Sequence, residues 1–133
     1  MSRNIATTKK RTSTRPATRP QNDMIYRLQA DLCAALANPV RLQILDLLAD
    51  EEMTSSQLLA ILQIPKANLS QHLAVLKDAG IIRARKEGLY QNMSLALPRI
   101  KDACQIIKSV LAEKVEQEEK RHADLRRELK ATR

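Results

Sequence analysis

The sequence contains no Trp and no Phe, and only two Tyr, among its 133 residues. A chain of this length is enough for one domain with one modest core. Because aromatic side chains are nearly absent, that core must be aliphatic and built mainly from Leu and Ile. The chain has only two Gly, which excludes a glycine-rich phosphate-binding loop. Its Ser, His and Asp residues form no nucleophile motif. We therefore expect neither an enzyme nor a bound cofactor.

Long apolar runs and disulfide-rich spacing are also lacking. No stretch of 18 apolar residues occurs, so we expect no membrane-spanning segment and no membrane partner. No apolar segment follows Met1, so no secretory signal is predicted. Two cysteines indicate a reducing compartment rather than a disulfide scaffold. These absences together predict a cytoplasmic protein.

Acidic residues are missing from the first 21 positions, which hold six Lys or Arg. The net charge of +8 is therefore mostly a property of this segment, and the remaining 112 residues carry a surplus of only two positive charges. The segment is rich in Thr, Arg, Ser and Pro and has few large apolar residues, which predicts a disordered basic tail over residues 1–21. It could be a solubilising tail, a non-specific phosphate-binding arm or a transit peptide.

Helix-start signals divide the next part of the chain into short helices. Asn38-Pro39 supplies an N-cap followed by Pro at the first helical position. Thr54 and Gln57 have the spacing of a capping box. Gln63-Ile64-Pro65 is a tight turn between two helices, which is the helix-turn-helix pattern. Helices are expected over residues 23–37, 39–49, 54–62 and 65–79, with Val40, Leu42, Ile44, Leu45 and Leu48 packing from the second.

Residues 65–95 are the most informative stretch. Leu69, Leu73 and Leu76 form one apolar stripe of a helix whose other face is polar, and Gly80 is placed to end that helix. The next residues alternate as two strands around a hairpin turn at Glu87-Gly88. A polar-faced helix followed by a basic hairpin is typical of a recognition helix and a wing. The pattern therefore predicts a double-stranded DNA ligand.

Each part of this stretch has a predicted role on DNA. In the major groove, Gln71 and Asn68 suit adenine, and Ala67 suits a thymine methyl group. The wing should hold phosphates or the adjacent minor groove, which fixes register but not sequence. His72 either contacts a base or phosphate or packs, partly buried, under the wing. The candidate DNA-binding residues are Lys66, Ala67, Asn68, Ser70, Gln71, His72, Arg83, Arg85 and Lys86.

The last helix is expected to run from Leu97 to Ala131. Its apolar residues follow steps of three and four as far as Val115, and the following stretch is almost wholly charged. A helix of this length cannot bury itself against so small a domain. The apolar part is therefore predicted to meet a partner helix and form a dimer. The charged end is either a solvated helix or a weak coiled-coil extension.

Two motifs together resemble the ArsR/SmtB family of transcriptional repressors. They are Leu36-Ala-Asn-Pro-Val-Arg-Leu-Gln-Ile-Leu45 and Leu69-Ser-Gln-His-Leu-Ala-Val-Leu-Lys-Asp-Ala-Gly-Ile-Ile82. The resemblance implies a mainly α fold with a two-stranded β wing, dimerised through its first and last helices. It also implies repression that an inducer relieves. The domain prediction is a tail over 1–21, a winged helix-turn-helix domain over 22–115 and a charged helical extension over 116–133.

The inducer sites that the resemblance implies are largely missing. Residues 54–57 carry no thiols where the family has a Cys-x-Cys site, residues 96–99 carry no zinc ligands, and residues 44–47 contain no Cys. Cys33 and Cys104 lie on helices that pack together in the family, so they are candidates for sensing an arsenical, a soft metal or an oxidant or sulfur species. They could equally be small core residues. No metal site is predicted.

Two other functions remain open at this point. The wing and its helix could form a docking surface of a protein-interaction module, with the charged last helix as a coiled-coil partner site. Alternatively, the basic tail could drive sequence-independent, architectural binding to DNA.

Overall fold

Asn38 and Pro39 set the first corner of the chain. The structure is a computed structural model that describes residues 20–132. Helix α1 (Pro20–Leu36) and helix α2 (Pro39–Asp50) meet at 88°. The Asn38 side chain accepts hydrogen bonds from the backbone N of Val40 (2.9 Å) and of Arg41 (3.2 Å), which confirms the predicted N-cap. Helix α1 begins before the expected residue 23, and the rest of the predicted tail lies outside the described residues.

The capping box at Thr54 is confirmed and begins helix α3 (Ser55–Leu62). Thr54 Oγ1 accepts from Gln57 N at 3.2 Å, and Gln57 Oε1 accepts from Thr54 N at 2.8 Å. Gln63 then adopts a left-handed conformation (φ 52°), and helix α4 (Lys66–Asp78) follows after a short turn. Gly80, at φ 73°, follows the end of α4. The predicted helix-turn-helix is therefore α3, the turn and α4.

The wing is part of a three-stranded antiparallel sheet. Strands β2 (Ile82–Glu87) and β3 (Tyr90–Leu95) form the expected hairpin, and a two-residue strand, β1 (Met53–Thr54), adds to β3 to give the order β1-β3-β2. The turn residues are Gly88-Leu89, not the predicted Glu87-Gly88, because Glu87 pairs with Tyr90. Gly88 has φ 60° and Leu89 has no positive φ, as in a type II′ turn.

The core is aliphatic, as predicted, and is drawn from every element of the winged body. Its fully buried side chains are Ile44, Leu58, Leu69, Leu76, Ile81 and Met93. Leu42 was predicted to pack in this core but is exposed. Within residues 20–132 no single helix combines the length and apolarity that crossing a membrane requires, and only the bent pair of α1 and α2 reaches them jointly.

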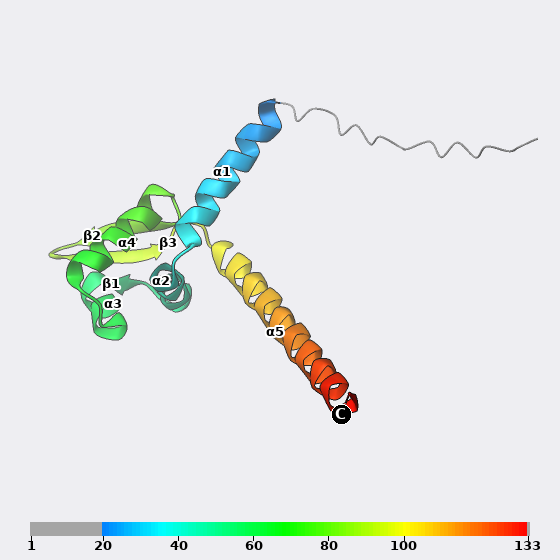
Figure 1. Cartoon of the computed structure of the whole chain (residues 1–133). Helices are drawn as coiled ribbons and strands as arrows, with labels where there is room; N and C mark the ends of the chain where they lie inside the picture. The colour runs from blue at the N-terminus through cyan, green and yellow to red at the C-terminus, as the bar shows by residue number, and fades with distance from the viewer. Residues whose placement is uncertain (1–19, 133) are drawn as a thin grey trace, which may run out of the picture.

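Two helices project from this body (Figure 1). Helix α5 (Ile100–Ala131) begins three residues later than predicted, because the Ala96 and Leu97 amides donate to Ile81 O (2.8 and 3.4 Å) and tie that segment to the start of the sheet. Only the first turns of α5 are buried, through Ile100 and Cys104. The helix continues without a break past residue 115. The predicted domain boundary at that residue is therefore not a break in the backbone, and it marks only the point where the sequence becomes mostly charged.

Candidate nucleic-acid interface

Helix α4 presents a largely polar surface to solvent. Leu69, Leu73 and Leu76 face the core, and the opposite side of the helix is exposed. The exposed side chains predicted to enter a groove are Lys66, Ala67, Asn68, Ser70 and Gln71. The Ser70 hydroxyl donates to Lys66 O at 3.1 Å, which leaves its oxygen lone pairs available as acceptors. The structure thus brings together on one face the residues that the sequence proposed for base contacts.

The N-terminus of α4 is open. Its N-cap residue is Pro65, whose side chain makes no capping hydrogen bond. The backbone N–H groups of the first turn therefore have no side-chain acceptor from the cap residue, and they lie at the positive end of the helix dipole. Such a helix end favours phosphate oxygens. The reading face and a phosphate-binding end accordingly lie on the same element.

His72 lies at the border of this face and the core. Its side chain is half-buried, and its Nδ1 is 3.4 Å from Nη1 of Arg41 on α2. Because a guanidinium can only donate, Nδ1 is the acceptor of this contact. The half-buried position fits the packing role considered for His72, although its printed contact is Arg41 on α2 and not the wing, and a base contact is left to the Nε2 edge of the ring.

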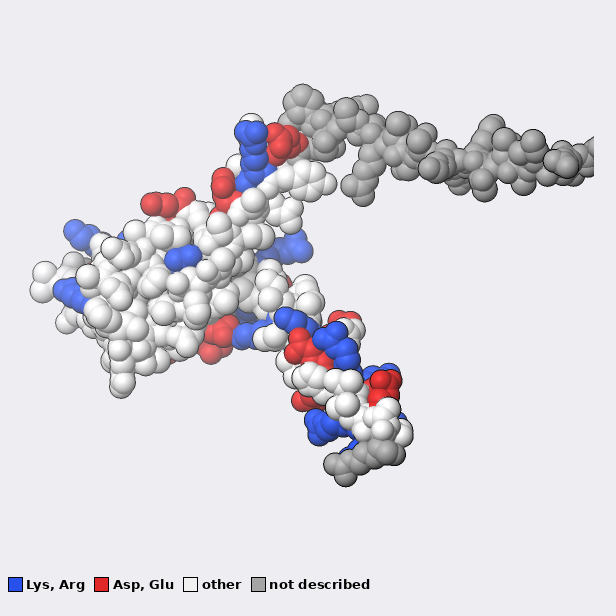
Figure 2. Space-filling view, in the orientation of Figure 1, with Lys and Arg blue, Asp and Glu red and all other residues white. Residues whose placement is uncertain are grey.

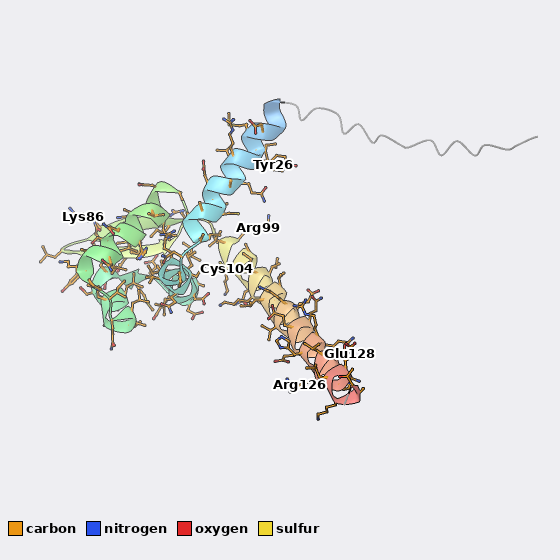
Figure 3. All side chains as sticks on the ribbon, in the orientation of Figure 1. Tyr26, Lys86, Arg99, Cys104, Arg126 and Glu128 are labelled. Carbon is orange, nitrogen blue, oxygen red and sulfur yellow. The ribbon has the colours of Figure 1, made fainter. Side chains whose placement is uncertain are left out.

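The wing carries its basic residues on both faces. Arg83 and Arg85 share one face, and Lys86 lies on the other with Gln91 as its cross-strand neighbour. All three are exposed. Figure 3 places Lys86 toward the free end of the hairpin, away from α1 and α5. Figure 2 shows isolated basic side chains at this end of the body and intermixed charges of both signs along α5.

Arg85 differs from the other two because it is paired with carboxylates. Its Nη2 lies 3.1 Å from Glu52 Oε2 and 2.8 Å from Glu87 Oε1. Glu52 immediately precedes β1, so the unpredicted strand brings this carboxylate to the wing. A phosphate would have to displace or share these partners. Neither Arg83 nor Lys86 forms an ion pair within the described part of the chain.

The outer part of α1 and the middle of α5 expose many apolar side chains. Ile107, Val110 and Leu111 are each 57% exposed, and Ile25 and Leu28 are exposed to a similar extent. Among residues 23–131, the exposed large apolar side chains of the two helices are Met24, Ile25, Tyr26, Leu28, Ile106, Ile107, Val110, Leu111, Val115, Leu125 and Leu129. Many exposed apolar side chains on projecting helices are typical of an interaction site.

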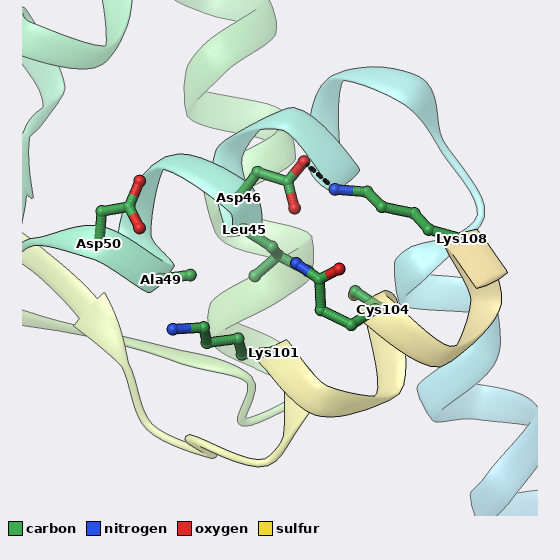
Figure 4. Close-up of a pocket in the computed structure, with 8 residues that line it drawn as sticks. Leu45, Asp46, Ala49, Asp50, Lys101, Cys104 and Lys108 are labelled. Atoms are coloured by element: carbon green, nitrogen blue, oxygen red, sulfur yellow. Dashed lines mark hydrogen bonds and ion pairs between the residues drawn. The ribbon is translucent and has the colours of Figure 1, made fainter.

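The two cysteines are both free and have different environments. Cys33 is exposed on α1, and Cys104 is buried on α5. Cys104 lines a cavity of about 250 Å³ between α2 and α5, beside an ion pair of Lys108 with Asp46 at 2.6 Å (Figure 4). Burial raises the pKa of the Cys104 thiol, Asp46 raises it further, and Lys108 partly opposes them. The thiol is therefore a poor nucleophile in this conformation.

Residues 20–132 contain no group of three His, Cys, Asp or Glu placed to hold a metal ion. The contacts of Arg41 and the carboxylates that pair with Arg85 were not predicted from the sequence. The one available signal for Arg41 was its position in the first turn of α2, just after the end of α1. No sequence pattern pointed to Glu52.

Comparison with known proteins agrees with this geometry. Residues 36–85 match a family model described as a helix-turn-helix domain. An HTH-type transcriptional regulator of Mycobacterium tuberculosis is 34% identical over 93 residues, covering 69% of this chain and 82% of the relative. Its crystal structure superposes with a TM-score of 0.65, covering 70% of this chain and 94% of that one.

Two further relatives define the family. The HTH-type transcriptional repressor SmtB of Mycobacterium tuberculosis is 35% identical over 73 residues, covering 55% of this chain and 53% of the repressor. A homodimeric winged helix-turn-helix DNA-binding domain from Mycobacterium bovis, described as a possible ArsR-family transcriptional regulator, is 28% identical with a TM-score of 0.66, covering 74% of this chain and 91% of that domain. The chain thus belongs to the ArsR/SmtB family of winged helix-turn-helix transcriptional regulators.

Proposed function

We propose that this protein is a homodimeric repressor that binds a specific double-stranded operator and is released from it by an inducer. The observation that carries the proposal is the outward polar face of α4. A buried leucine stripe holds this helix, and no other element of the described chain covers its exposed side chains. The relative SmtB is a transcriptional repressor, which supports the proposal that this protein regulates by repression. We place the protein in the cytoplasm, together with the DNA that it is proposed to bind.

The proposed DNA contacts divide into residues that read the base sequence and residues that hold the DNA backbone in place. Gln71 and Asn68 read adenine through paired hydrogen bonds, and Ala67 contacts a thymine methyl group. Lys66, Ser70 and the open N-terminus of α4 hold the flanking backbone. Arg83 and Lys86 on the wing contact phosphates or the adjacent minor groove without reading sequence. Arg85 and His72 join them only after loosening their present partners, the carboxylates and Arg41 respectively.

Dimerisation uses the exposed apolar faces of α1 and α5. Burying side chains such as Ile107 and Leu111 against a second copy removes apolar area from water, which is the main driving force of such association. The homodimeric Mycobacterium bovis domain supports this assembly. Two copies then present two α4 helices to successive major grooves, with half-site centres about 34–36 Å apart.

For the inducer, Cys33 and Cys104 are the candidate thiol sensors, for an arsenical, a soft metal or an oxidant or sulfur species. Soft thiolates suit these ligands. The burial of Cys104 and its raised pKa add a requirement, because an inducer must reach this thiol through the adjacent cavity or after α5 shifts from α2. Release from DNA would then follow from movement of a dimerisation helix.

The roles on DNA are tested by two matched variants, with affinity measured on the operator that the wild-type protein selects and on single-base variants of it. Gln71→Ala should lose about 1–3 kcal/mol of discrimination at one base position in each half-site. Lys86→Ala should weaken binding to all duplexes alike and lower the salt slope by about 1 per contact. If both variants scale all affinities by one common factor, the groove assignment is wrong.

A further inference from the structure

One side chain, Arg41, contacts two other helices at the base of the projecting α1. It lies on α2 and is half-buried. Its Nε donates to Ala35 O at 2.6 Å, its Nη2 donates to Ala34 O at 3.2 Å, and its Nη1 lies 3.4 Å from His72 Nδ1 on α4. In addition to their direct packing, the recognition helix and the end of α1 are therefore linked through this guanidinium.

The contacts fit the chemistry of a helix C-terminus. The last carbonyls of a helix lack intrahelical donors and carry the negative end of the dipole, where a cation is stabilising. The last turn of α1 has no basic residue of its own. Arg41 supplies the missing charge from the next helix, and its planar fork can donate in two directions at once, whereas a lysine ammonium offers no such fixed geometry.

Arg41 is not engaged elsewhere in the described chain. No carboxylate there forms an ion pair with it. Between α1 and α2 the backbone provides only a short bend at Ala37 and Asn38, and α1 leaves the body at this point (Figure 1). The direction of α1 relative to α4 thus depends on this bend, on the direct packing of α1 against α4, on the packing of Leu32 and Leu36 in the core, and on the guanidinium.

From this geometry we infer that Arg41 is a positioning residue that sets the angle between α1 and α4, and thereby the spacing at which a dimer reads its two half-sites. The inference rests on the proposed function, in which α1 belongs to the dimer interface. A rigid joint at the base of α1, together with the packing of α5 on α2, holds the two α4 helices at one separation and one rotational phase. Loosening the joint lets each α4 move while the interface and the reading face stay intact.

Spacing preference is the readout that separates positioning from simple stabilisation. The operator selected by the wild-type protein is remade with its half-sites moved apart or together by one or two base pairs. Two base pairs change the separation by about 7 Å and the phase by roughly 70°. The full chain is tested as wild type, Arg41→Met, Arg41→Lys and Arg126→Ala. The last removes one exposed charge near the end of α5, distant from the joint (Figure 3).

The wild type and Arg126→Ala should bind the operator with the original spacing at least about 10-fold more tightly than the respaced operators, which is equivalent to about 1.4 kcal/mol of binding free energy. Arg41→Met should bind the operators of all spacings with Kd values within about 3-fold of one another. It should remain dimeric by sedimentation equilibrium. Arg41→Lys should fall between them, and it keeps the test valid if Arg41→Met fails to fold by circular dichroism.

Three results would overturn the inference. An Arg41 variant that loses affinity equally at every spacing, and so keeps the wild-type preference, shows a purely stabilising role. A monomeric but folded Arg41 variant places the residue in dimer formation. Failure of the wild-type protein to select any operator removes the proposed function itself, and the inference with it.

Discussion

Neutralising Glu52 should strengthen DNA binding. This carboxylate lies 3.1 Å from Nη2 of Arg85 and competes with a phosphate for that guanidinium. Glu87, at 2.8 Å, also competes, but it additionally accepts from Asn92 Nδ2 at 2.9 Å, so its replacement would disturb the hairpin. Glu52→Gln is therefore the cleaner change, because it removes one negative charge and one competitor and leaves β3 untouched.

The magnitude follows from the exposure of the pair. The Arg85 side chain is 59% exposed and that of Glu52 is 49% exposed, so their ion pair is worth at most about 1 kcal/mol. A dimer has two wings, which gives an upper limit of about 2 kcal/mol, or roughly 30-fold in Kd. Each Arg85 that newly neutralises a phosphate should also steepen the dependence of log K on log salt by about 0.9.

Fluorescence anisotropy on a labelled operator across a salt series measures both quantities. Glu128→Gln is the matched control, because it makes the same charge change near the end of α5 (Figure 3). Glu52→Gln should bind more tightly than this control and with a steeper salt slope. Equal affinity and equal slope in the two variants would show that Arg85 does not reach a phosphate and that its carboxylate pairs persist on DNA.

Two further predictions concern the body and the thiol. Leu76→Ala should lower the free energy of unfolding, measured in urea, by about 2–5 kcal/mol because Leu76 is fully buried. Val75 is 39% exposed on the same helix, so Val75→Ala should lower it by less than about 1 kcal/mol. Equal losses in the two variants would refute the assigned face of α4. Cys104 should be alkylated more slowly in the native than in the unfolded protein, up to and through the pH range around the ordinary thiol pKa of about 8.5, as followed by mass spectrometry. Since only the folded state disfavours its thiolate, Cys104 should also lower the free energy of unfolding as the pH rises through that range, and a Cys104→Ser variant should lose this dependence.

Local sequence signals were sufficient to predict a feature where a residue contacts its own neighbours along the chain. Asn38, Thr54 and Gly80 mark helix ends because their capping contacts lie within a few residues of themselves. The exposed face of α4 was equally readable, because the leucine stripe has the period of a helix and leaves the other side polar. The outward position of Gln71 followed from that period alone.

Features that depend on distant partners were not predictable in this way. Strand β1 has two residues, too few for any period, and it exists because Met53 pairs with Met93 across the sheet. The pairing of Arg85 with Glu52 follows from the position of β1. The turn at Gly88-Leu89 was predicted one residue early because strand register, not glycine alone, fixes which residues form a turn.

The most direct test of the whole account is selection from a pool of random duplexes by the full chain. We expect the wild-type chain to enrich an inverted repeat whose half-site centres lie about one helical turn apart, roughly 10 base pairs. When the Gln71→Ala variant replaces the wild type in the selection, both halves of the repeat should lose the preference for one base. Recovery of no sequence preference, or of an unpaired site that Gln71→Ala selects equally well, would contradict reading by two copies of α4.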